Sequence, residues 1–194
     1  MSTYDPGPPF TMGSYEYGAQ HDGRTHAGLD FLAPQDTPVP AAASGMVVGL
    51  GFDPTYGNLV IIQHTGATAT VHRYTLYAHL SGSAAVLVGQ RVSSGQTIGY
   101  VDMTGTGGNE VFHLHFELLH LDDPWQSEWQ RWNSKLVHWQ GNGVPLMLDN
   151  PEGRVNPLEE LSWAGLDVYS APRPEPARPR RGGGGGRFMA AAPF

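Results

Sequence analysis

Two histidines and a glutamate alternate with apolar residues in one short segment of the chain, residues 111–119. In a β-strand, alternate side chains point to the same face, so His113, His115 and Glu117 would lie side by side. Neighbours on one face are about 7 Å apart, and we expect one imidazole to bind a metal while the other stands beside it. Solvent-exposed strand histidines are the simpler alternative. The opposite face would join a core through Phe112, Leu114, Phe116 and Leu118.

Two other places in the chain carry candidate ligands or catalytic imidazoles. His26 and Asp30 are separated by three residues, in a segment whose Gly28 indicates a loop that enters a strand. Imidazole and carboxylate groups both bind zinc when they are deprotonated. His79 ends the apolar segment 77–80, where a polar side chain is unexpected. Taken separately, a turn hydrogen bond would explain the His26–Asp30 pair, and an exposed strand end would explain His79.

Together, the three segments offer the ligand set of a catalytic zinc site. His26, Asp30 and His115 would supply three nitrogen and oxygen ligands and leave a fourth position for water, whereas a structural site is closed by four protein ligands. The chain has no cysteine, so ligation by nitrogen and oxygen is the only option. His79 and His113 would then remain near the metal as imidazoles that do not bind it.

The elements that must position these side chains are predicted to be short β-strands. The chain has 26 glycines and 16 prolines, and only 15% of its residues are charged, which favours a turn-rich β protein over a helical bundle. Short apolar segments bounded by turn residues predict a mainly antiparallel sheet. These segments are residues 45–51, 58–64, 68–80, 86–92, 96–101 and 111–119.

The remaining parts of the chain differ in composition from this sheet. Residues 1–25 are rich in glycine, proline and tyrosine and predict an irregular arm before a domain of residues 26–170. In residues 123–140, four tryptophans and a leucine recur at intervals of three and four, which predicts an inserted helix. Residues 171–194 alternate proline with charge and then run through five glycines, a composition typical of a disordered tail.

The charge distribution excludes some classes of protein. The net charge is −7, and residues 171–194 hold five arginines and one glutamate, leaving 6 of the 11 basic and 17 of the 18 acidic residues in 1–170. Because contacts to phosphates need a basic surface, such an acidic body argues against a nucleic-acid-binding protein. The sequence contains no run of 18 apolar residues, so no membrane span is expected. The first ten residues have neither the basic nor the apolar region of a secretory signal.

These motifs, in this order, resemble the lysostaphin/LytM-type zinc metallopeptidases. The resemblance covers about residues 20–119, and Val155–Leu158 is similar to the family's closing segment. One departure is that Val111-Phe112 replaces the usual Gly-Pro, at the rim of the groove where specificity is set; the tryptophan-rich stretch resembles an insertion. The segments that carry the resemblance are His26–Phe31, Thr37–Ala41, Gly45–Val47, Tyr56–His64, Tyr77–Leu80, Val88–Val92, Ser94–Gly99, Thr104–Gly107 and His113–Glu117.

The resemblance implies a fold, a reaction and roles for the site residues. It implies a mainly antiparallel, barrel-sandwich hybrid sheet with a long groove over the metal. It implies that His26, Asp30 and His115 bind zinc, that His79 and His113 are catalytic, and that the substrate is a peptide bond in peptidoglycan cross-bridges or stem peptides. Our hypothesis makes His113 the general base, while His79 donates a hydrogen bond to the oxyanion or leaving amine; the two histidines could exchange these roles.

Other functions fit the sequence less well. A non-enzymatic wall-binding or regulatory relative is expected to lack metal ligands, and none is missing here. A biotinyl or lipoyl carrier needs a lysine on a hairpin tip, but the only lysine is Lys135 in the predicted helix. A cupin places its His-x-His earlier in the sheet. Because the substrate lies outside the cytoplasm and no export signal is visible, we expect a phage-type lytic or virion-associated enzyme; a trimmed secreted enzyme is the alternative.

Overall fold

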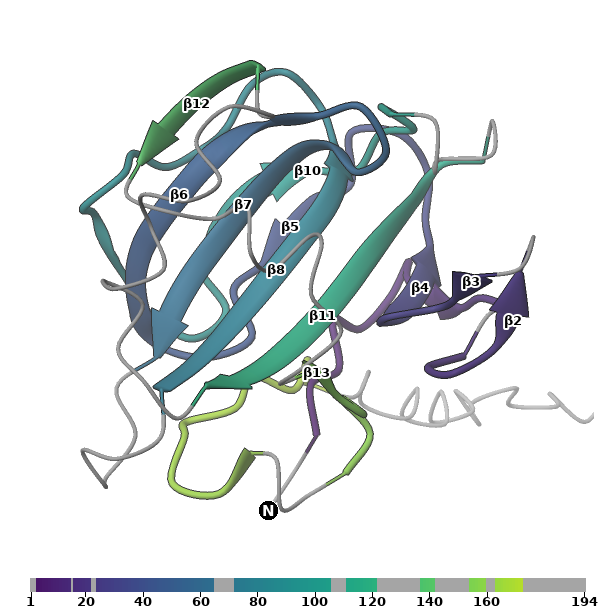
Figure 1. The fold of residues 1–194 in the computed structure, drawn as a ribbon. Helices are drawn as coiled ribbons and strands as arrows, with labels where there is room; N and C mark the ends of the chain where they lie inside the picture. Colours follow the sequence, from purple (N-terminus) through teal and green to yellow (C-terminus); the bar gives the residue numbers. More distant parts are fainter. Residues whose placement is uncertain are drawn as a thin grey trace, which may run out of the picture.

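A computed structural model of the chain shows a mainly β protein built around one large sheet (Figure 1). Every strand pair within the described residues is antiparallel, as the strand lengths and turns predicted. The described residues contain no helix long and apolar enough to cross a membrane. The structure describes residues 3–14, 16–21, 24–64, 72–105, 111–121, 137–141, 154–159 and 163–172.

The large sheet places the strand that carries the His-x-His motif between two others that carry site residues. In spatial order its strands are β1 (Thr11–Met12), β4 (Leu29–Leu32), β11 (His113–Leu121), β8 (His72–Leu80), β7 (Gly57–His64), β6 (Gly45–Asp53) and β12 (Val137–Gly141). Two short strands pair at its margins: β13 (Arg154–Val155) with β11, and β9 (Arg91–Val92) with β6. Two small ladders complete the fold: β5 (Pro38–Pro40) with β10 (Thr97–Tyr100), and β2 (Gln20–His21) with β3 (Arg24–Thr25).

The sheet separates two apolar clusters, because successive side chains of a strand point to opposite faces. Leu114, Phe116 and Leu118 of β11 join the larger cluster, together with Val39 of β5 and Ile98 of β10. The β5–β10 ladder therefore forms a second layer on this face, behind the large sheet in Figure 1. Six further side chains form a smaller cluster on the other face: Leu59, Ile61, Tyr74, Leu76, Ala78 and Leu119. The alternation predicted for β11 is thus confirmed.

Two predicted elements differ from the structure. Of the strand expected over 86–92, only β9 forms, because Gly89 takes a positive φ of 83° in a turn and the Gln90 side chain accepts a hydrogen bond from the Leu87 N–H. The prediction of a helix over 123–140 is wrong for its last residues, which instead form β12, the edge strand that pairs with β6. Residues 123–136 lie outside the described residues.

Segments at the two ends of the described chain pack onto the core. Tyr4 in the arm is only 4% exposed, and its hydroxyl donates to the Pro40 carbonyl. Trp163 is fully buried and stacks on Phe116 of β11 with 6.1 Å between ring centroids. Described parts of the segment 1–25, for which an irregular arm is predicted, are therefore anchored to the core, and this segment also contributes the short strands β1, β2 and β3. The tail expected over 171–194 lies outside the described residues from residue 173 onward.

Candidate metal centre

The pairing of β4 with β11 brings two of the three predicted metal ligands together. Asp30 lies directly opposite His115 in the antiparallel register. His26 reaches the same place because the loop before β4, which contains His26 and Gly28, runs close to β11. A Cβ added to Gly28 would lie 2.2 Å from the Phe116 carbonyl oxygen. A glycine at this position lets the loop approach closely enough for His26 to lie beside His115.

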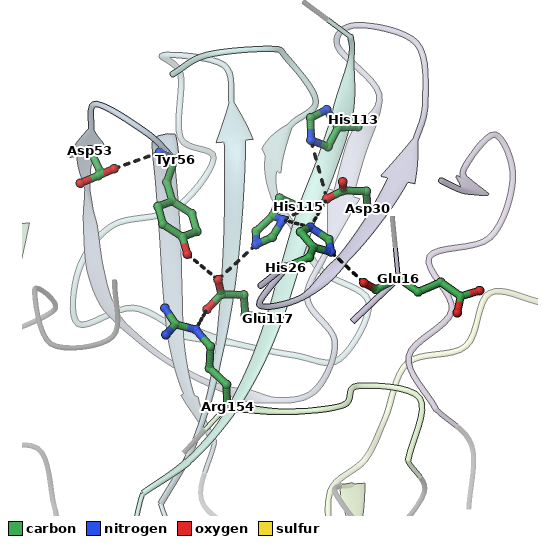
Figure 2. Close-up of polar contacts among 9 residues, drawn as sticks. All are labelled: Glu16, His26, Asp30, Asp53, Tyr56, His113, His115, Glu117 and Arg154. Carbon is green, nitrogen blue, oxygen red and sulfur yellow. Dashed lines mark hydrogen bonds and ion pairs between the residues drawn. The ribbon is translucent and has the colours of Figure 1, made fainter. Parts of the chain in front are cut away.

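The donor atoms of His26, Asp30 and His115 form a compact triangle (Figure 2). Asp30 Oδ1 lies 2.9 Å from His115 Nδ1 and 3.2 Å from His26 Nε2. The two histidine nitrogens are 3.1 Å apart. Ligands about 2.0–2.1 Å from a tetrahedral zinc would be about 3.3 Å from one another, so this triangle is close to one face of such a tetrahedron.

Hydrogen bonds on the far side of each imidazole select the tautomer that a metal site needs. His26 Nδ1 lies 3.2 Å from the Glu16 carbonyl oxygen, and His115 Nε2 lies 3.1 Å from Glu117 Oε1. Both oxygens are acceptors, so the ring proton lies on the nitrogen that faces them. The other nitrogen of each ring points into the triangle, where it could bind a metal once it carries no proton. These residues therefore fit a zinc ion, with donor types, spacing and tautomers that agree.

The electrostatics of the triangle favour an ionised carboxylate facing a cation. Burial would raise the pKa of Asp30, but the hydrogen bonds from His115 and His26 outweigh it and hold this pKa well below its usual range. Burial would lower the pKa of His115, but its hydrogen bonds to Asp30 and Glu117 raise it to about 9. Metal binding at His115 would therefore release a proton.

His79 reaches the site through a β-bulge. The register of β7 with β8 steps from Asn58↔Leu80 to Val60↔Tyr77, which leaves one extra residue in β8. His79 itself has a φ of 57°, an unusual value for a residue with a side chain. The bulge lets Leu80 stay in the larger core cluster with Tyr77, while the His79 ring lies 4.7 Å from the His113 ring between centroids.

His113 stands beside the triangle without belonging to it. Its Nε2 is 3.7 Å from Asp30 Oδ1, and its Nδ1 is 2.8 Å from the Val111 carbonyl oxygen. The backbone of Asp102 links the backbones of His79 and His113. Its N–H donates to the His79 carbonyl, and its carbonyl accepts from the His113 N–H. The structure thus brings all five predicted site residues together.

His79 and His113 share one tautomer and one protonation state. His79 Nδ1 lies 2.8 Å from the Thr104 carbonyl oxygen, so in each ring Nδ1 carries the proton and Nε2 keeps a lone pair. Burial is the main cause that lowers the pKa of both, to about 3 for His79. Both rings are therefore neutral at pH 7 and can accept a proton at Nε2.

Behind His115 lies a buried polar cluster that sequence reasoning found only in part. Glu117 is fully buried; its Oε1 accepts a 2.7 Å hydrogen bond from the Tyr56 hydroxyl, and its Oε2 lies 2.8 Å from Arg154 Nε (Figure 2). Burial would raise the pKa of Glu117, but the hydrogen bond from His115 and the charge of Arg154 lower it. The alternation in β11 indicated Glu117, whereas no local pattern pointed to Tyr56 or Arg154.

Comparison with known protein families agrees with this geometry. Residues 24–127, more than half of the chain, match peptidase family M23. The chain belongs to peptidase family M23. The resemblance drawn from the sequence motifs is thereby confirmed, and the three donor residues, His79 and the His-x-His motif all lie inside the matched region of this M23 chain.

Two relatives of this M23 chain each match about half of it. The DD-carboxypeptidase/endopeptidase Mpg of Neisseria meningitidis is 40% identical over 97 residues, which are 50% of this chain and 20% of that protein. The peptidoglycan DD-endopeptidase ShyC of Vibrio cholerae is 38% identical over 96 residues, again 50% of this chain and 20% of that protein. The M23 chain therefore matches about a fifth of the length of each of these relatives.

Solved structures of M23 relatives share the fold. A zinc-containing peptidase from Vibrio cholerae superposes with a TM-score of 0.51 and is 32% identical, covering 61% of this chain and 36% of that one. The catalytic domain of lysostaphin from Staphylococcus simulans superposes with a TM-score of 0.50 and is 30% identical, covering 66% of this chain and 87% of that one. The predicted lysostaphin-like antiparallel fold is confirmed for this M23 chain.

Proposed function

We propose that this chain is a zinc-dependent endopeptidase that hydrolyses peptide bonds in peptidoglycan. The convergence of three donor atoms, from His26, Asp30 and His115, at the spacing of one face of a zinc tetrahedron is the observation that carries this proposal. His26, Asp30 and His115 would hold the ion. A zinc ion bound there would polarise the scissile carbonyl and lower the pKa of a bound water to about 7.

The two remaining histidines supply a general base and a group that orients the attacking water. We assign the general base to His113, because its neutral Nε2 can take a proton from the attacking water and the nearby Asp30 carboxylate stabilises the resulting imidazolium. The water oxygen bonds to the carbonyl carbon, the carbon–nitrogen bond breaks, and the proton passes from His113 to the leaving amine. His79, which has the same tautomer, orients the water by accepting a hydrogen bond at Nε2. This role differs from the donor role expected from the sequence.

The substrate assignment rests on the family and on the names of relatives. The Vibrio relative is a peptidoglycan DD-endopeptidase, and the sequence motifs resemble those of enzymes that cut cross-bridges or stem peptides. We propose action at the cell wall, from a domain of residues 26–170, with a phage-type lytic or virion-associated setting. Mass spectrometry of fragments released from peptidoglycans of defined composition would identify the bond that is cut.

The test of this function is a pair of substitutions in one strand. His115→Ala should abolish both zinc binding and hydrolysis, because it removes a ligand. His113→Ala should keep its zinc but lose about 100-fold or more in turnover, because it removes the base. His120→Ala, on the opposite face of the same strand, is the matched control and should keep both. Zinc content is measured by elemental analysis and turnover by fragment release. Hydrolysis that persists after chelation, or wild-type turnover in His113→Ala, would contradict the proposal.

A further inference from the structure

A single arginine outside the family-matched region neutralises the buried carboxylate behind the metal centre. Glu117 is fully buried, and a buried carboxylate is stable only when it is hydrogen-bonded and paired with a charge. Three groups reach it: His115 Nε2 at 3.1 Å, the Tyr56 hydroxyl at 2.7 Å and Arg154 Nε at 2.8 Å. Among them, only the guanidinium is permanently charged.

The position of Arg154 fixes which oxygen of Glu117 faces the histidine. Arg154 holds Oε2, and this leaves Oε1 directed at His115 Nε2 (Figure 2). That contact orients the ring so that Nδ1 faces His26 and Asp30. The orientation of the predicted zinc ligand therefore depends on a guanidinium two contacts away.

The backbone of Arg154 is itself held from two sides. Strand β13 pairs with β11, with Arg154 opposite Leu119, and the Tyr17 hydroxyl donates a 3.1 Å hydrogen bond to the Arg154 carbonyl. The family match ends at residue 127, so this contribution comes from a segment beyond it. The rigid planar fork of arginine suits such a fixed position better than the flexible ammonium of lysine.

We propose that Arg154 is a positioning residue of the metal centre, which acts through Glu117 to hold His115 in its zinc-binding orientation. This inference rests on the proposed function. It predicts that the loss of Arg154 weakens zinc binding by a route separate from the loss of fold stability.

The experiment measures zinc affinity by chelator competition and the Tm of the metal-free protein, in the full chain. Arg154→Met should lower zinc affinity about 10–100-fold, the range expected for residues behind a metal ligand. Arg154→Lys, which keeps the charge but not the fork, should lose less. The double variant Arg154→Met/Glu117→Gln removes the whole buried pair and should regain Tm relative to Arg154→Met, with zinc affinity still about tenfold or more below wild type.

Arg73→Met provides a matched control for a purely structural arginine. Arg73 lies in β8, and its Nη1 donates to the Ala164 carbonyl in the C-terminal segment, away from the donor triangle. This variant should lower Tm and leave zinc affinity within about twofold of wild type.

Two results would overturn the inference. One is wild-type zinc affinity in a folded Arg154→Met protein; the other is full recovery of zinc affinity together with Tm in the double variant, which would make the role of Arg154 structural. If Arg154→Met does not fold, Arg154→Lys and the double variant give the same comparison. Failure of the wild-type chain to bind zinc would instead contradict the proposed function itself.

Discussion

At the scale of single residues, the site depends on which nitrogen of each imidazole carries the proton. The side chains of His26, His79, His113 and His115 each meet an acceptor oxygen outside the donor triangle on one nitrogen, and the second nitrogen of His26 and of His115 faces Asp30. The sequence predicted these residues because they lie in short motifs whose spacing is local. It could not predict the acceptors, since carbonyl groups such as that of Thr104 are brought in by the path of the backbone.

Arg154 shows most clearly what local patterns leave out. Its contact with Glu117 exists because a strand of two residues pairs with β11, and nothing in the residues around it indicates that pairing. Glu117 was predictable as a neighbour of His115 from strand alternation alone. Its burial was not, because burial depends on which distant segments cover that face of the sheet.

A histidine away from the site should make stability depend on pH. His64 is 1% exposed, its Nδ1 bonds to the Ser44 carbonyl and its Nε2 lies 2.8 Å from Thr75 Oγ1; burial lowers its pKa to about 4. Because protonation of this ring is disfavoured only in the folded state, its contribution to the free energy of unfolding is complete above about pH 6.5. This free energy falls by about 3 kcal/mol as the pH falls toward 4.

Urea unfolding at pH 7 and pH 4.5 would measure this effect in the wild type and in His64→Gln. The variant cannot be protonated at this position, so its free energy of unfolding should fall less between the two pH values than that of the wild type. Equal losses in the two proteins would show that His64 does not contribute to acid sensitivity.

At the scale of elements, apolar segments bounded by turn residues predicted most of the sheet, while backbone irregularities were missed. The predicted strands over 45–51, 58–64 and 111–119 correspond to β6, β7 and β11. The bulge at His79 was not predictable, because it places a residue with a side chain at positive φ. Such conformations are stabilised by surrounding structure and not by local preference, and they are frequent at functional sites.

The loop before β4 should tolerate no side chain at Gly28. The added Cβ of Gly28→Ala would lie 2.2 Å from a backbone oxygen of β11, which cannot move without disturbing the sheet. We expect a loss of about 1–3 kcal/mol in stability, and a loss of zinc affinity because His26 is displaced. Gly82→Ala is the matched control, since nothing lies within 4 Å of its added Cβ. Urea unfolding measures the change in stability, and chelator competition measures the change in zinc affinity. Unchanged zinc affinity in Gly28→Ala would contradict this account of the loop.

At the scale of the whole molecule, the folded unit is larger than the family-matched region. Tyr4 from the arm and Trp163 from the C-terminal segment both belong to the larger core cluster, although they lie outside residues 24–127. The sequence predicted an irregular arm here because aromatic residues among glycines and prolines form no periodic pattern. Their burial became visible only once the sheet was assembled.

Trp163→Ala should therefore destabilise the domain as strongly as a change within the sheet. The ring is fully buried and stacks on Phe116, and removing such a side chain costs about 3–5 kcal/mol. Leu158→Ala, in the same segment but 44% exposed, should change stability by less than about 0.5 kcal/mol. Urea unfolding of both variants tests this, and similar midpoints for them would mean that the segment adds nothing to the core.

The chain enters and leaves this domain at one point. Asp5 and Ser170 form a parallel bridge, with the Asp5 N–H donating to the Tyr169 carbonyl and the Ala171 N–H donating to the Asp5 carbonyl. When the first and last segments of a folded unit lie side by side, joining them requires only a short connection. The folded unit between Asp5 and Ser170 is therefore suited to circular permutation, and to insertion as a cassette into a surface loop of an unrelated carrier protein, with the sheet and the candidate metal centre left intact.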